Sequence, residues 1–364
     1  MTAASLVARC AHGLEPTLSA EILQLGLGAI THLGHREIHF RALRPGPVAP
    51  RTADDVFLLA GHRPDPGTAR RDVAALSRLA MEADLDTLLE LRRAHGGPGG
   101  VSGVSGVSGV EVSASFLGGR NFNRYDVEDA VGSVLARRLG VGYHSRRTAG
   151  APPPGHTGWR VTLDGLRATL MLRIAERPLH RRDYKRHTVP GTLHPPLAAA
   201  MARIADIRPG HTVLDPCCGA GTLLAEAGGQ APRAVLYGFD LALSAVRAAR
   251  ENTAGLGVVV GRADAGRLPL PDGSVDRVLS NPPWGGQVTA LGLLAASPSH
   301  WWAELRRVLA PDGTAVVLLP GLDELPLGLR HGLVPAHVQG VRVSGAQTFL
   351  VRLTAPTRPR RTRK

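Results

Sequence analysis

Four apolar runs in the C-terminal half of the chain each end in a polar side chain that could bind a ligand. The first, VLDPCCGAGT, continues from Asp215 into a glycine turn and then a helical stretch, so backbone N–H groups become available beside the carboxylate. Ligands of open α/β sheets bind outside the carboxyl ends of the strands. We therefore expect one crevice that gathers Asp215, Gly219, Gly221, Asp240, Asp264 and Asn281.

The spacing of these residues helps to select a cofactor. A dinucleotide fingerprint requires a third glycine where this chain has Leu224, so the glycine turn argues against NAD. Asp240 ends the second expected strand, where a carboxylate can accept a hydrogen bond from a ribose. Each acid alone is equally compatible with an ordinary loop residue, but polar groups at four consecutive strand ends favour a binding site.

The elements around these residues follow an alternating pattern. Strands are expected at residues 212–215, 235–240, 258–260, 275–279 and 315–319, with helices between them. This alternation predicts a parallel, doubly wound sheet. The final stretches HVQGVRV and AQTFLVRL, which no helix separates, predict a hairpin at one edge of that sheet.

The N-terminal half predicts smaller α+β modules. Residues 14–25 place apolar side chains on one helical face, and VEVSASF alternates as a half-buried strand does. YDVEDAVGSVLARRL predicts a helix with Asp126 as its N-cap, and two later strands meet at Asp164-Gly165, a dipeptide favoured in tight turns. The Val-Ser-Gly repeats within residues 96–109 predict a flexible insertion, because frequent glycine removes side chains and helix propensity.

The net charge of +13 is concentrated in one middle segment and at the C-terminal end. Residues 120–190 contain 14 Lys and Arg against 6 Asp and Glu, whereas residues 1–119 contain 11 against 12. The tail RPRRTRK adds five basic residues. This distribution indicates a phosphate-binding surface. The alternative interpretation is that the chain is rich in arginine and that these residues lie on ordinary solvated faces.

Cysteine and histidine usage predicts neither disulfides nor a metal site. Cys10, Cys217 and Cys218 form no paired framework, and adjacent cysteines are poorly placed to bridge or to ligate zinc, so we expect reduced thiols. The histidines of residues 180–194 lack metal-ligand spacing. The sequence has no signal peptide and no run of about 18 apolar residues, which predicts a cytoplasmic protein without a membrane partner.

Four stretches resemble the successive motifs of class I S-adenosylmethionine-dependent methyltransferases, over roughly residues 190–355. They are DPCCGAGT, GFDLALSAVRAARENT, GRADAGRLPLPDGSVDRVLSNPPW and RRVLAPDGTAVVLLP. The resemblance implies a Rossmann-like fold, S-adenosyl-L-methionine as the cofactor, and further cofactor contacts from Pro216 and Ala265. The Asn-Pro-Pro-aromatic form is the one that this family uses for exocyclic amines of nucleobases or for glutamine side chains.

The stretch SNPPW then acquires a chemical role. An exocyclic amine is a poor nucleophile, because its lone pair is delocalised into the ring. If Asn281 Oδ1 and the Pro282 carbonyl each accept one amine hydrogen, the lone pair can be directed at the methyl donor, while Trp284 offers a face for base stacking. We expect Asn281, Pro282 and Trp284 to be the catalytic residues. The family more often has tyrosine or phenylalanine at the aromatic position, so the larger tryptophan leaves the dimensions of the pocket open.

The first half resembles the ferredoxin-like and THUMP domains of RNA methyltransferases that modify guanine N2. GLEPTLSAEILQLG, the basic strand-helix-hairpin module and RPLHRRDYKRH carry this resemblance. It implies a ferredoxin-like unit at 1–75, a THUMP module at 76–188 with the insertion at 96–109, a methyltransferase domain at 189–355 and a basic tail at 356–364. We expect RNA contacts from Arg120, Arg124, Arg181, Arg182, Lys185 and Arg186, although a solvated charge run is the alternative for the last four.

These features predict an RNA methyltransferase that forms N2-methylguanosine in tRNA, in or near the acceptor stem, and that acts as a monomer. The alternatives are an adenine-N6 or ribosomal guanine-N2 methyltransferase and a catalytically silent RNA-binding protein. The motif alone does not choose between guanine and adenine, because either exocyclic amine offers two hydrogens. The nucleotide modified and the number of methyl groups transferred stay open.

Overall fold

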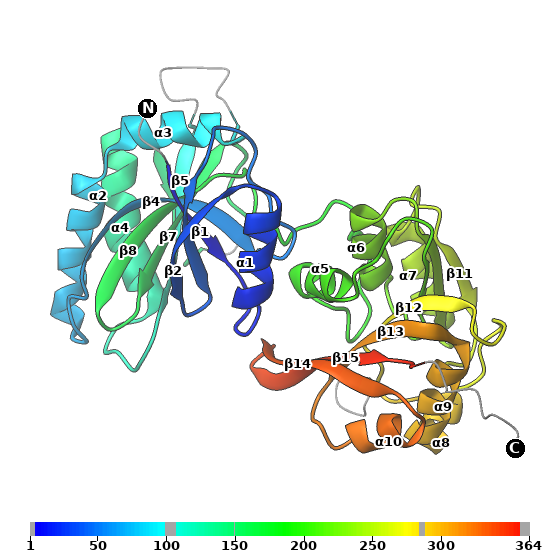
Figure 1. Ribbon diagram of the computed structural model, residues 1–364. Coiled ribbons are helices and arrows are strands. Elements are labelled where there is room, and N and C mark those ends of the chain that lie inside the picture. Colours follow the sequence, from blue (N-terminus) through cyan, green and yellow to red (C-terminus); the bar gives the residue numbers. More distant parts are fainter. Residues whose placement is uncertain (1–3, 99–106, 149, 284–287, 357–364) are drawn as a thin grey trace, which may run out of the picture. The chain divides into compact units, whose positions relative to one another are not determined.

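The computed structural model describes residues 4–98, 107–148, 150–283 and 288–356 (Figure 1). The chain divides into two compact units, the first comprising Met1–Arg9 and Ser19–Leu179 and the second comprising Cys10–Leu18 and His180–Lys364. Each unit is built around its own sheet. Trp284, residues 99–106 of the expected insertion and residues 357–364 of the basic tail lie outside the described residues.

The first unit contains an eight-stranded sheet in the order β2-β3-β1-β4-β8-β7-β5-β6. β5 pairs in parallel with β6 and β7, and the other neighbours are antiparallel. The predicted hairpin at Asp164-Gly165 is confirmed, since it joins β7 to β8. The strands are β1 (Ser5–Arg9), β2 (Gly28–Gly34), β3 (Glu37–Ala42), β4 (Asp55–Pro64), β5 (Gly109–Phe116), β6 (Gly142–His144), β7 (His156–Leu163) and β8 (Arg167–Arg173).

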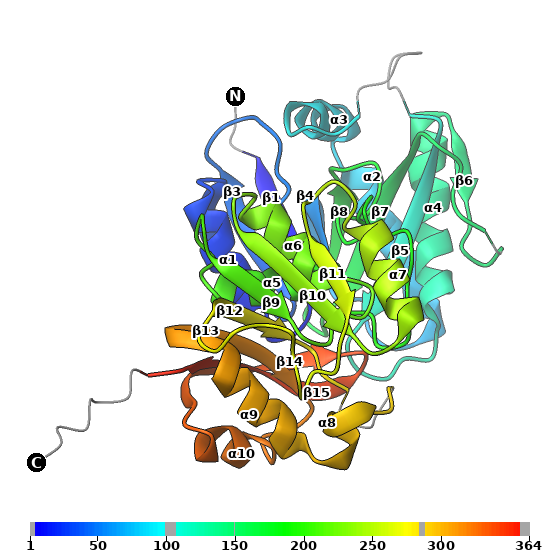
Figure 2. The same ribbon diagram turned by 90° about the vertical axis from the view of Figure 1, so that its right-hand side faces the viewer.

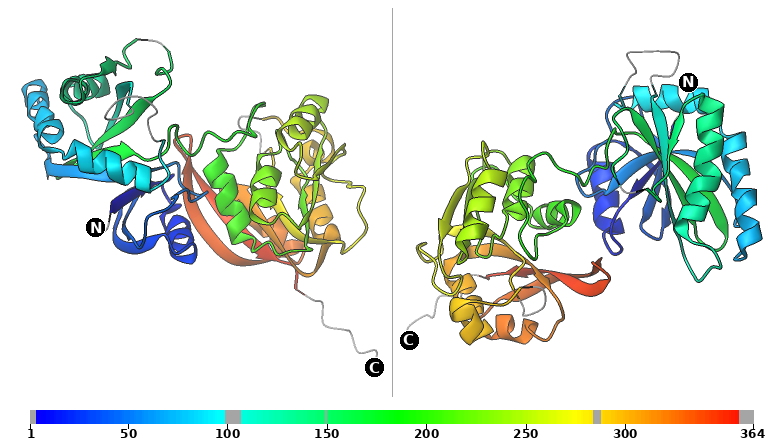
Figure 3. Two further views of the ribbon diagram at one scale, coloured as in Figure 1. Left: turned by 90° about the horizontal axis from the view of Figure 1, so that it is seen from above. Right: turned by 180° about the vertical axis from the view of Figure 1, so that it is seen from behind.

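One sheet therefore spans the two N-terminal modules expected from the sequence. The connection is the antiparallel pairing of β4 with β8, in which Leu58 lies opposite Leu172. Figure 3 shows α2 and α4 along one face of this sheet. The boundary between a ferredoxin-like unit and a THUMP module stays a prediction. The helices in this half are α1 (Glu15–Gln24), η1 (Arg70–Leu76), α2 (Ser77–Glu82), α3 (Leu85–Ala94) and α4 (Arg124–Leu139).

The start of α4 differs from the sequence prediction. Asn123, not Asp126, is the N-cap, and its side chain accepts a hydrogen bond of 3.2 Å from the Asp126 N–H. The Asp126 carboxylate accepts the Asn123 N–H in return at 3.0 Å. This reciprocal capping box satisfies two N–H groups at once, so the helix begins three residues earlier than the prediction based on Asp126 alone.

The second unit confirms the doubly wound α/β class. Its sheet has the order β11-β10-β9-β12-β13-β15-β14, with the first five strands parallel. The predicted edge hairpin is present, because β15 pairs antiparallel with β13 and β14 closes the edge. The strands are β9 (Thr212–Asp215), β10 (Val235–Asp240), β11 (Val259–Arg262), β12 (Val275–Ser280), β13 (Leu309–Leu319), β14 (Val334–Val343) and β15 (Ala346–Thr354).

Helices cover both faces of this second sheet (Figures 1 and 2). α5 (Pro195–Ile204), α6 (Thr222–Gln230) and α7 (Leu243–Asn252) lie on one face. α8 (Gly292–Ala296), α9 (Pro298–Val308) and α10 (Leu325–Arg330) lie on the other, where Trp301 and Trp302 are fully buried against Val278 and Val317. This core fixes β12 between β9 and β13, and thereby fixes the position of the residues that follow β12.

Among the described residues, none of the helices combines the length and the apolar character that a bilayer crossing requires.

Candidate cofactor and methyl-acceptor site

Parallel pairing brings the predicted site residues to one edge of the second sheet. Asp215 lies opposite Gly238 of β10, and Leu214 lies opposite Val278 of β12, so all three strands end at the same edge. β11 continues this arrangement beside β10 and leads toward Asp264. The expected crevice is therefore formed by consecutive strand ends, as in other open α/β sheets.

The glycine turn after β9 is held by the carboxylate that ends β10. Asp240 Oδ2 accepts the Gly219 N–H at 3.0 Å, and Asp240 Oδ1 accepts the Ala242 N–H at 2.9 Å. Gly219 has a φ of +50° and Gly221 a φ of +77°, which side chains with a Cβ rarely adopt. Within the described part of the chain each Asp240 oxygen accepts one hydrogen bond, so the carboxylate is oriented and still able to bind a pair of hydroxyl groups.

Asp215 is the most buried acid of this edge, with 1% of its surface exposed. Its Oδ1 accepts the Cys217 N–H at 3.2 Å. Burial raises the pKa of the Asp215 carboxyl well above its ordinary value, and the nearby Asp240 raises it further. A cationic ligand at this edge would relieve that repulsion.

The environment of the turn favours the protonated form of its two thiols. Burial raises the pKa of Cys217 and Cys218 well above the usual range, and the negative charges of Asp215 and Asp240 add to the effect. Protonated thiols are poor nucleophiles and poor metal ligands. In the part of the chain that the structure describes, no three His, Cys, Asp or Glu side chains gather as a metal site would require.

Asp264 ties the loop after β11 to the start of α8. Its Oδ1 accepts the Gly266 N–H and its Oδ2 accepts the Leu293 N–H, each at 2.9 Å. Ala265 beside it is buried, with 7% of its surface exposed. Both residues lie where the sequence predicts cofactor contacts, and that role stays a prediction.

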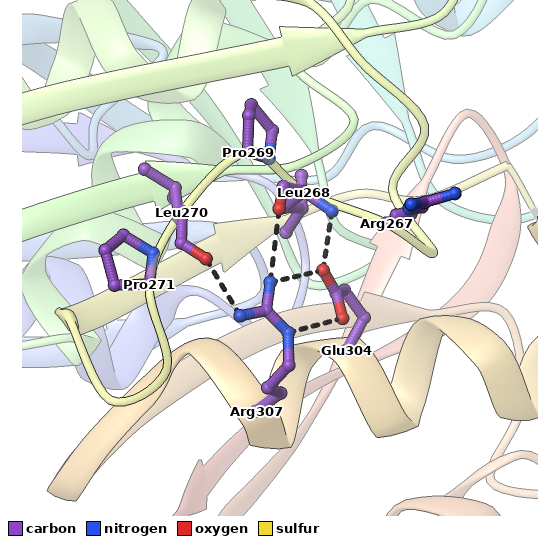
Figure 4. A pocket seen from close by; sticks show the side chains of 7 residues that line it. All are labelled: Arg267, Leu268, Pro269, Leu270, Pro271, Glu304 and Arg307. Atoms are coloured by element: carbon purple, nitrogen blue, oxygen red, sulfur yellow. Dashed lines mark hydrogen bonds and ion pairs between the residues drawn. The ribbon is translucent and has the colours of Figure 1, made fainter.

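Glu304 and Arg307 of α9 form hydrogen bonds to the same loop. Figure 4 shows a surface pocket of about 530 Å³ lined by residues 267–271 together with Glu304 and Arg307. The Arg307 guanidinium donates to both Glu304 oxygens at 2.8 and 2.6 Å and to the Leu270 carbonyl at 2.8 Å, while the Leu268 N–H donates to Glu304 at 2.5 Å. The charges of Glu304 and Arg307 thus satisfy one another, and their hydrogen bonds to Leu268 and Leu270 hold the loop in place.

Asn281 follows β12 and faces the segment that precedes α5. Its Nδ2 donates to the Gly191 carbonyl at 3.4 Å. Among the described residues, Asn281 Oδ1 accepts no hydrogen bond, and Pro282 is buried. Trp284 lies outside the described residues, so its stacking role stays a prediction.

The sequence predicted four RNA contacts within Arg181–Arg186. In the structure two of these side chains bind groups of the second unit and two are exposed. Arg182 Nε donates at 2.9 Å to Glu226 of α6, whose side chain is fully buried, and the Tyr184 hydroxyl donates to the same oxygen at 2.8 Å. Lys185 Nζ donates to the Leu193 carbonyl at 3.1 Å. Arg182 and Lys185 therefore stabilise the second unit itself, whereas Arg181 and Arg186 are exposed.

Of the two RNA contacts predicted near α4, one residue is buried in an ion pair and the other is exposed. The Arg120 side chain is only 3% exposed and forms a bidentate ion pair with Asp65, at 2.7 and 2.6 Å. Such a paired, buried guanidinium is not available for a phosphate, which corrects the expectation for Arg120. Arg124 is exposed and packs over the Tyr125 ring with its guanidinium carbon 4.7 Å from the ring centroid.

Two positioning residues were not predicted from the sequence. Asn252, at the end of α7, is 2% exposed and makes four hydrogen bonds that join residues 186–187 to the glycine turn. Glu226, within the apolar stretch of α6, anchors Arg182 and Tyr184. Each of them is a polar residue on the apolar, buried face of an amphipathic helix. Because a buried polar group needs a hydrogen-bond partner, this position in the sequence could have identified them.

These residues fit S-adenosylmethionine, whose sulfonium and ammonium groups are cations and whose ribose has two hydroxyls. Asp240 would hold the ribose, the glycine turn and Asp215 would lie beside the charged part, and Asp264 with Ala265 would flank the adenine. When bound, the cofactor supplies a methyl group on a positively charged sulfur. The doubly wound sheet and this site define a class I S-adenosylmethionine-dependent methyltransferase.

Comparison with known proteins specifies the family. The UPF0020 family, described as an RMKL-like methyltransferase domain, matches residues 182–343. A tRNA (guanine(6)-N2)-methyltransferase of Thermus thermophilus is 38% identical over 236 residues, which cover 61% of this chain and 67% of that protein. The chain belongs to the family of this methyltransferase.

Further similarities extend over different shares of the chain. The crystal structure of TrmN from Thermus thermophilus matches with a TM-score of 0.72 and 29% identity, covering 96% of this chain and 99% of that one. A U6 snRNA (guanine-N(2))-methyltransferase, THUMPD2 of Bos taurus, is 35% identical over 127 residues, which are 34% of this chain and 25% of that protein. The first similarity supports the fold of both units, and the second is limited to a shorter segment.

Replacing Asp215 with asparagine should stabilise the ligand-free protein and weaken cofactor binding. Because the folded-state pKa of Asp215 is raised, wild-type stability falls as pH rises from the ordinary carboxyl range through that raised value. Asp215→Asn lacks this loss, so its free energy of unfolding in urea should exceed that of the wild type near neutral pH. Its cofactor affinity in calorimetry should fall about tenfold or more, which is about 1.4 kcal/mol.

The matched control is Asp323→Asn, at an exposed position of the same unit. It should leave both the pH dependence and the affinity unchanged. An Asp215→Asn protein whose stability declines with pH in parallel with the wild type would contradict the assignment of this carboxyl.

The neighbours Arg181 and Arg182 should differ when each is replaced by alanine. Arg182→Ala leaves the buried Glu226 without its cation and should destabilise the protein by about 3 kcal/mol, with an unchanged salt dependence of RNA binding. Arg181→Ala should preserve stability within about 0.5 kcal/mol and reduce the slope of log affinity against log salt by about 0.7 to 0.9. Urea unfolding and filter binding at several salt concentrations would measure both; equal behaviour of the two variants would contradict this division.

Proposed function

We propose that the protein transfers a methyl group from S-adenosylmethionine to the exocyclic N2 of a guanine in tRNA. The observation that carries the proposal is the placement of Asn281, which follows β12 next to the strand β9 that leads into the glycine turn, and whose Oδ1 accepts no hydrogen bond from a described group. The similarity to a tRNA (guanine(6)-N2)-methyltransferase supports guanine as the base and tRNA as the carrier. Nucleotide 6 of a tRNA belongs to the acceptor stem, so we place the target guanosine there.

The proposed chemistry depends mainly on positioning. Asn281 Oδ1 and the Pro282 carbonyl each accept one hydrogen of the amine, which orients its lone pair toward the methyl group, and Trp284 stacks on the base. Orientation of this kind can contribute about 7 to 11 kcal/mol in favourable cases. A strong general base is unnecessary, because the methyl donor is already activated and the amine proton can leave after transfer.

The proposed RNA contacts are the exposed cations Arg124, Arg181 and Arg186. A base inside a duplex cannot enter such a site, so the target guanosine must be extruded from the stem. We further propose that the protein acts in the cytoplasm and as a monomer.

Unmodified tRNA transcripts incubated with the protein and labelled cofactor should yield N2-methylguanosine. Nucleoside mass spectrometry would identify the product, and nuclease mapping would place it in or near the acceptor stem. Transcripts that lack the folded tRNA structure should be poor substrates, because one pocket has little surface with which to choose a guanosine. Label found only in N6-methyladenosine or only in ribosomal RNA would overturn the substrate, and no transfer despite cofactor binding would indicate a silent RNA-binding protein.

Asn281→Ala and Asp240→Ala should impair different stages of the reaction, methyl transfer and cofactor binding respectively. Asn281→Ala should reduce single-turnover methyl transfer about 10²- to 10³-fold, as removal of one preorganised hydrogen-bonding group from an active site does, and leave cofactor affinity within a few-fold. Asp240→Ala should weaken cofactor binding by about 1.5 to 3 kcal/mol, because a charged acceptor is lost. Near-normal turnover of Asn281→Ala on its RNA would refute the proposed mechanism.

A further inference from the structure

The segment His180–Leu193, here called the connecting segment, is fastened to the second unit at several points. Arg182 and Tyr184 bind the buried Glu226, as described above. Further along, Asn252 Oδ1 accepts the backbone N–H groups of Arg186 and His187, each at 2.9 Å. The segment therefore enters the site with a fixed backbone.

Asn252 also joins the connecting segment to the glycine turn. Its Nδ2 donates to the His187 carbonyl at 2.9 Å and to the Ala220 carbonyl at 2.8 Å. All four hydrogen-bonding positions of this buried amide are thereby used. The segment and the turn that is assigned to the cofactor are held at a fixed separation.

Gly191 lies where this segment meets Asn281. Its φ is +76°, and a Cβ built on it would lie 2.7 Å from Val288 Cγ2, so a larger residue would be both strained and crowded. The Gly191 carbonyl accepts Asn281 Nδ2 at 3.4 Å. The glycine thus touches the chain on both sides of the stretch that contains Trp284.

We propose that Gly191 is a positioning residue whose carbonyl selects the orientation of the Asn281 amide, so that Oδ1 rather than Nδ2 faces the substrate amine. A side-chain amide has one oxygen acceptor and one nitrogen donor at its end. If the Asn281 amide were flipped, its Nδ2 hydrogens would face the hydrogens of the guanine N2 amine. The side chain could then not accept an amine hydrogen or orient the lone pair of the amine nitrogen. At 3.4 Å the bond to Gly191 is long, and its effect lies in choosing between two orientations. The inference rests on the proposed role of Asn281.

Gly191→Ala tests this against Gly210→Ala. Gly210 has a similar φ of +84° but open space around its Cβ position, so the control carries comparable backbone strain away from the site. Gly191→Ala should reduce the turnover number tenfold or more, with KM for tRNA and cofactor affinity within about twofold of wild type. Gly210→Ala should retain wild-type turnover. Equal turnover of the two variants, or a Gly191→Ala defect confined to KM, would overturn the proposal.

A second measurement reports the amide itself and needs no activity. The chain contains four asparagines, Asn121, Asn123, Asn252 and Asn281, so labelling asparagine with ¹⁵N gives four side-chain amide pairs in a correlation spectrum. Loss of one pair in Asn281→Ala assigns it. In Gly191→Ala this pair should shift toward the position of the exposed Asn121 pair, while the Asn252 pair stays in place and shows that the segment remains folded. An unshifted Asn281 pair would overturn the proposal.

The two experiments separate this inference from the proposed function. If wild-type protein forms no N2-methylguanosine, the proposed function fails, and the amide spectra still report whether Gly191 orients Asn281. If wild-type protein forms the product and Gly191→Ala forms it equally fast, the inference fails and the function stands.

Discussion

The parallel pairing of β9 with β10 and β12 is the constraint on which the site depends. It aligns three strand ends, so the glycine turn, the Asp240 carboxylate proposed to bind the ribose and the Asn281 amide come from distant parts of the chain to one edge. Once aligned, the groups fix one another: Asp240 orients the turn through the Gly219 N–H, and Asn252 connects the turn to the connecting segment. Removing the pairing would leave each residue an ordinary loop side chain.

This arrangement is electrostatically unfavourable without a ligand. Asp215 is buried near Asp240, and burial raises its pKa, so the ligand-free fold holds a carboxylate in a poor environment. Two other buried acids are paired with arginines, Glu226 with Arg182 and Asp65 with Arg120. Glu128 is also buried with a raised pKa, but Asp215 differs from it in lying beside a second carboxylate at the ends of parallel strands. A buried acid with a perturbed pKa beside a like charge is typical of a functional site.

Strand ends and the edge hairpin could be predicted from the sequence, because alternation and turn residues are local signals. The predicted N-cap of α4 lay three residues too late. Asn123 and Asp126 each accept the backbone N–H of the other, so either residue alone resembles an N-cap in the sequence. Arg120 and Arg182 were predicted to contact RNA because their ion pairs could not be foreseen. Their acidic partners, Asp65 and Glu226, lie 55 and 44 residues away in the chain. A single sequence carries no signal for such pairs, nor for the Val288 side chain that crowds the position of a Cβ at Gly191.

The anchoring of Arg182 and Tyr184 on Glu226 also determines where this chain can be divided. The sequence places the start of the catalytic domain at residue 189, but a fragment cut there would bury a glutamate without its cation and leave Asn252 facing solvent where residues 186–187 had been. The compact unit instead begins its main segment at His180. A chimaera that exchanges the first unit of this chain should therefore be joined upstream of Arg182, so that the basic run stays with the second unit.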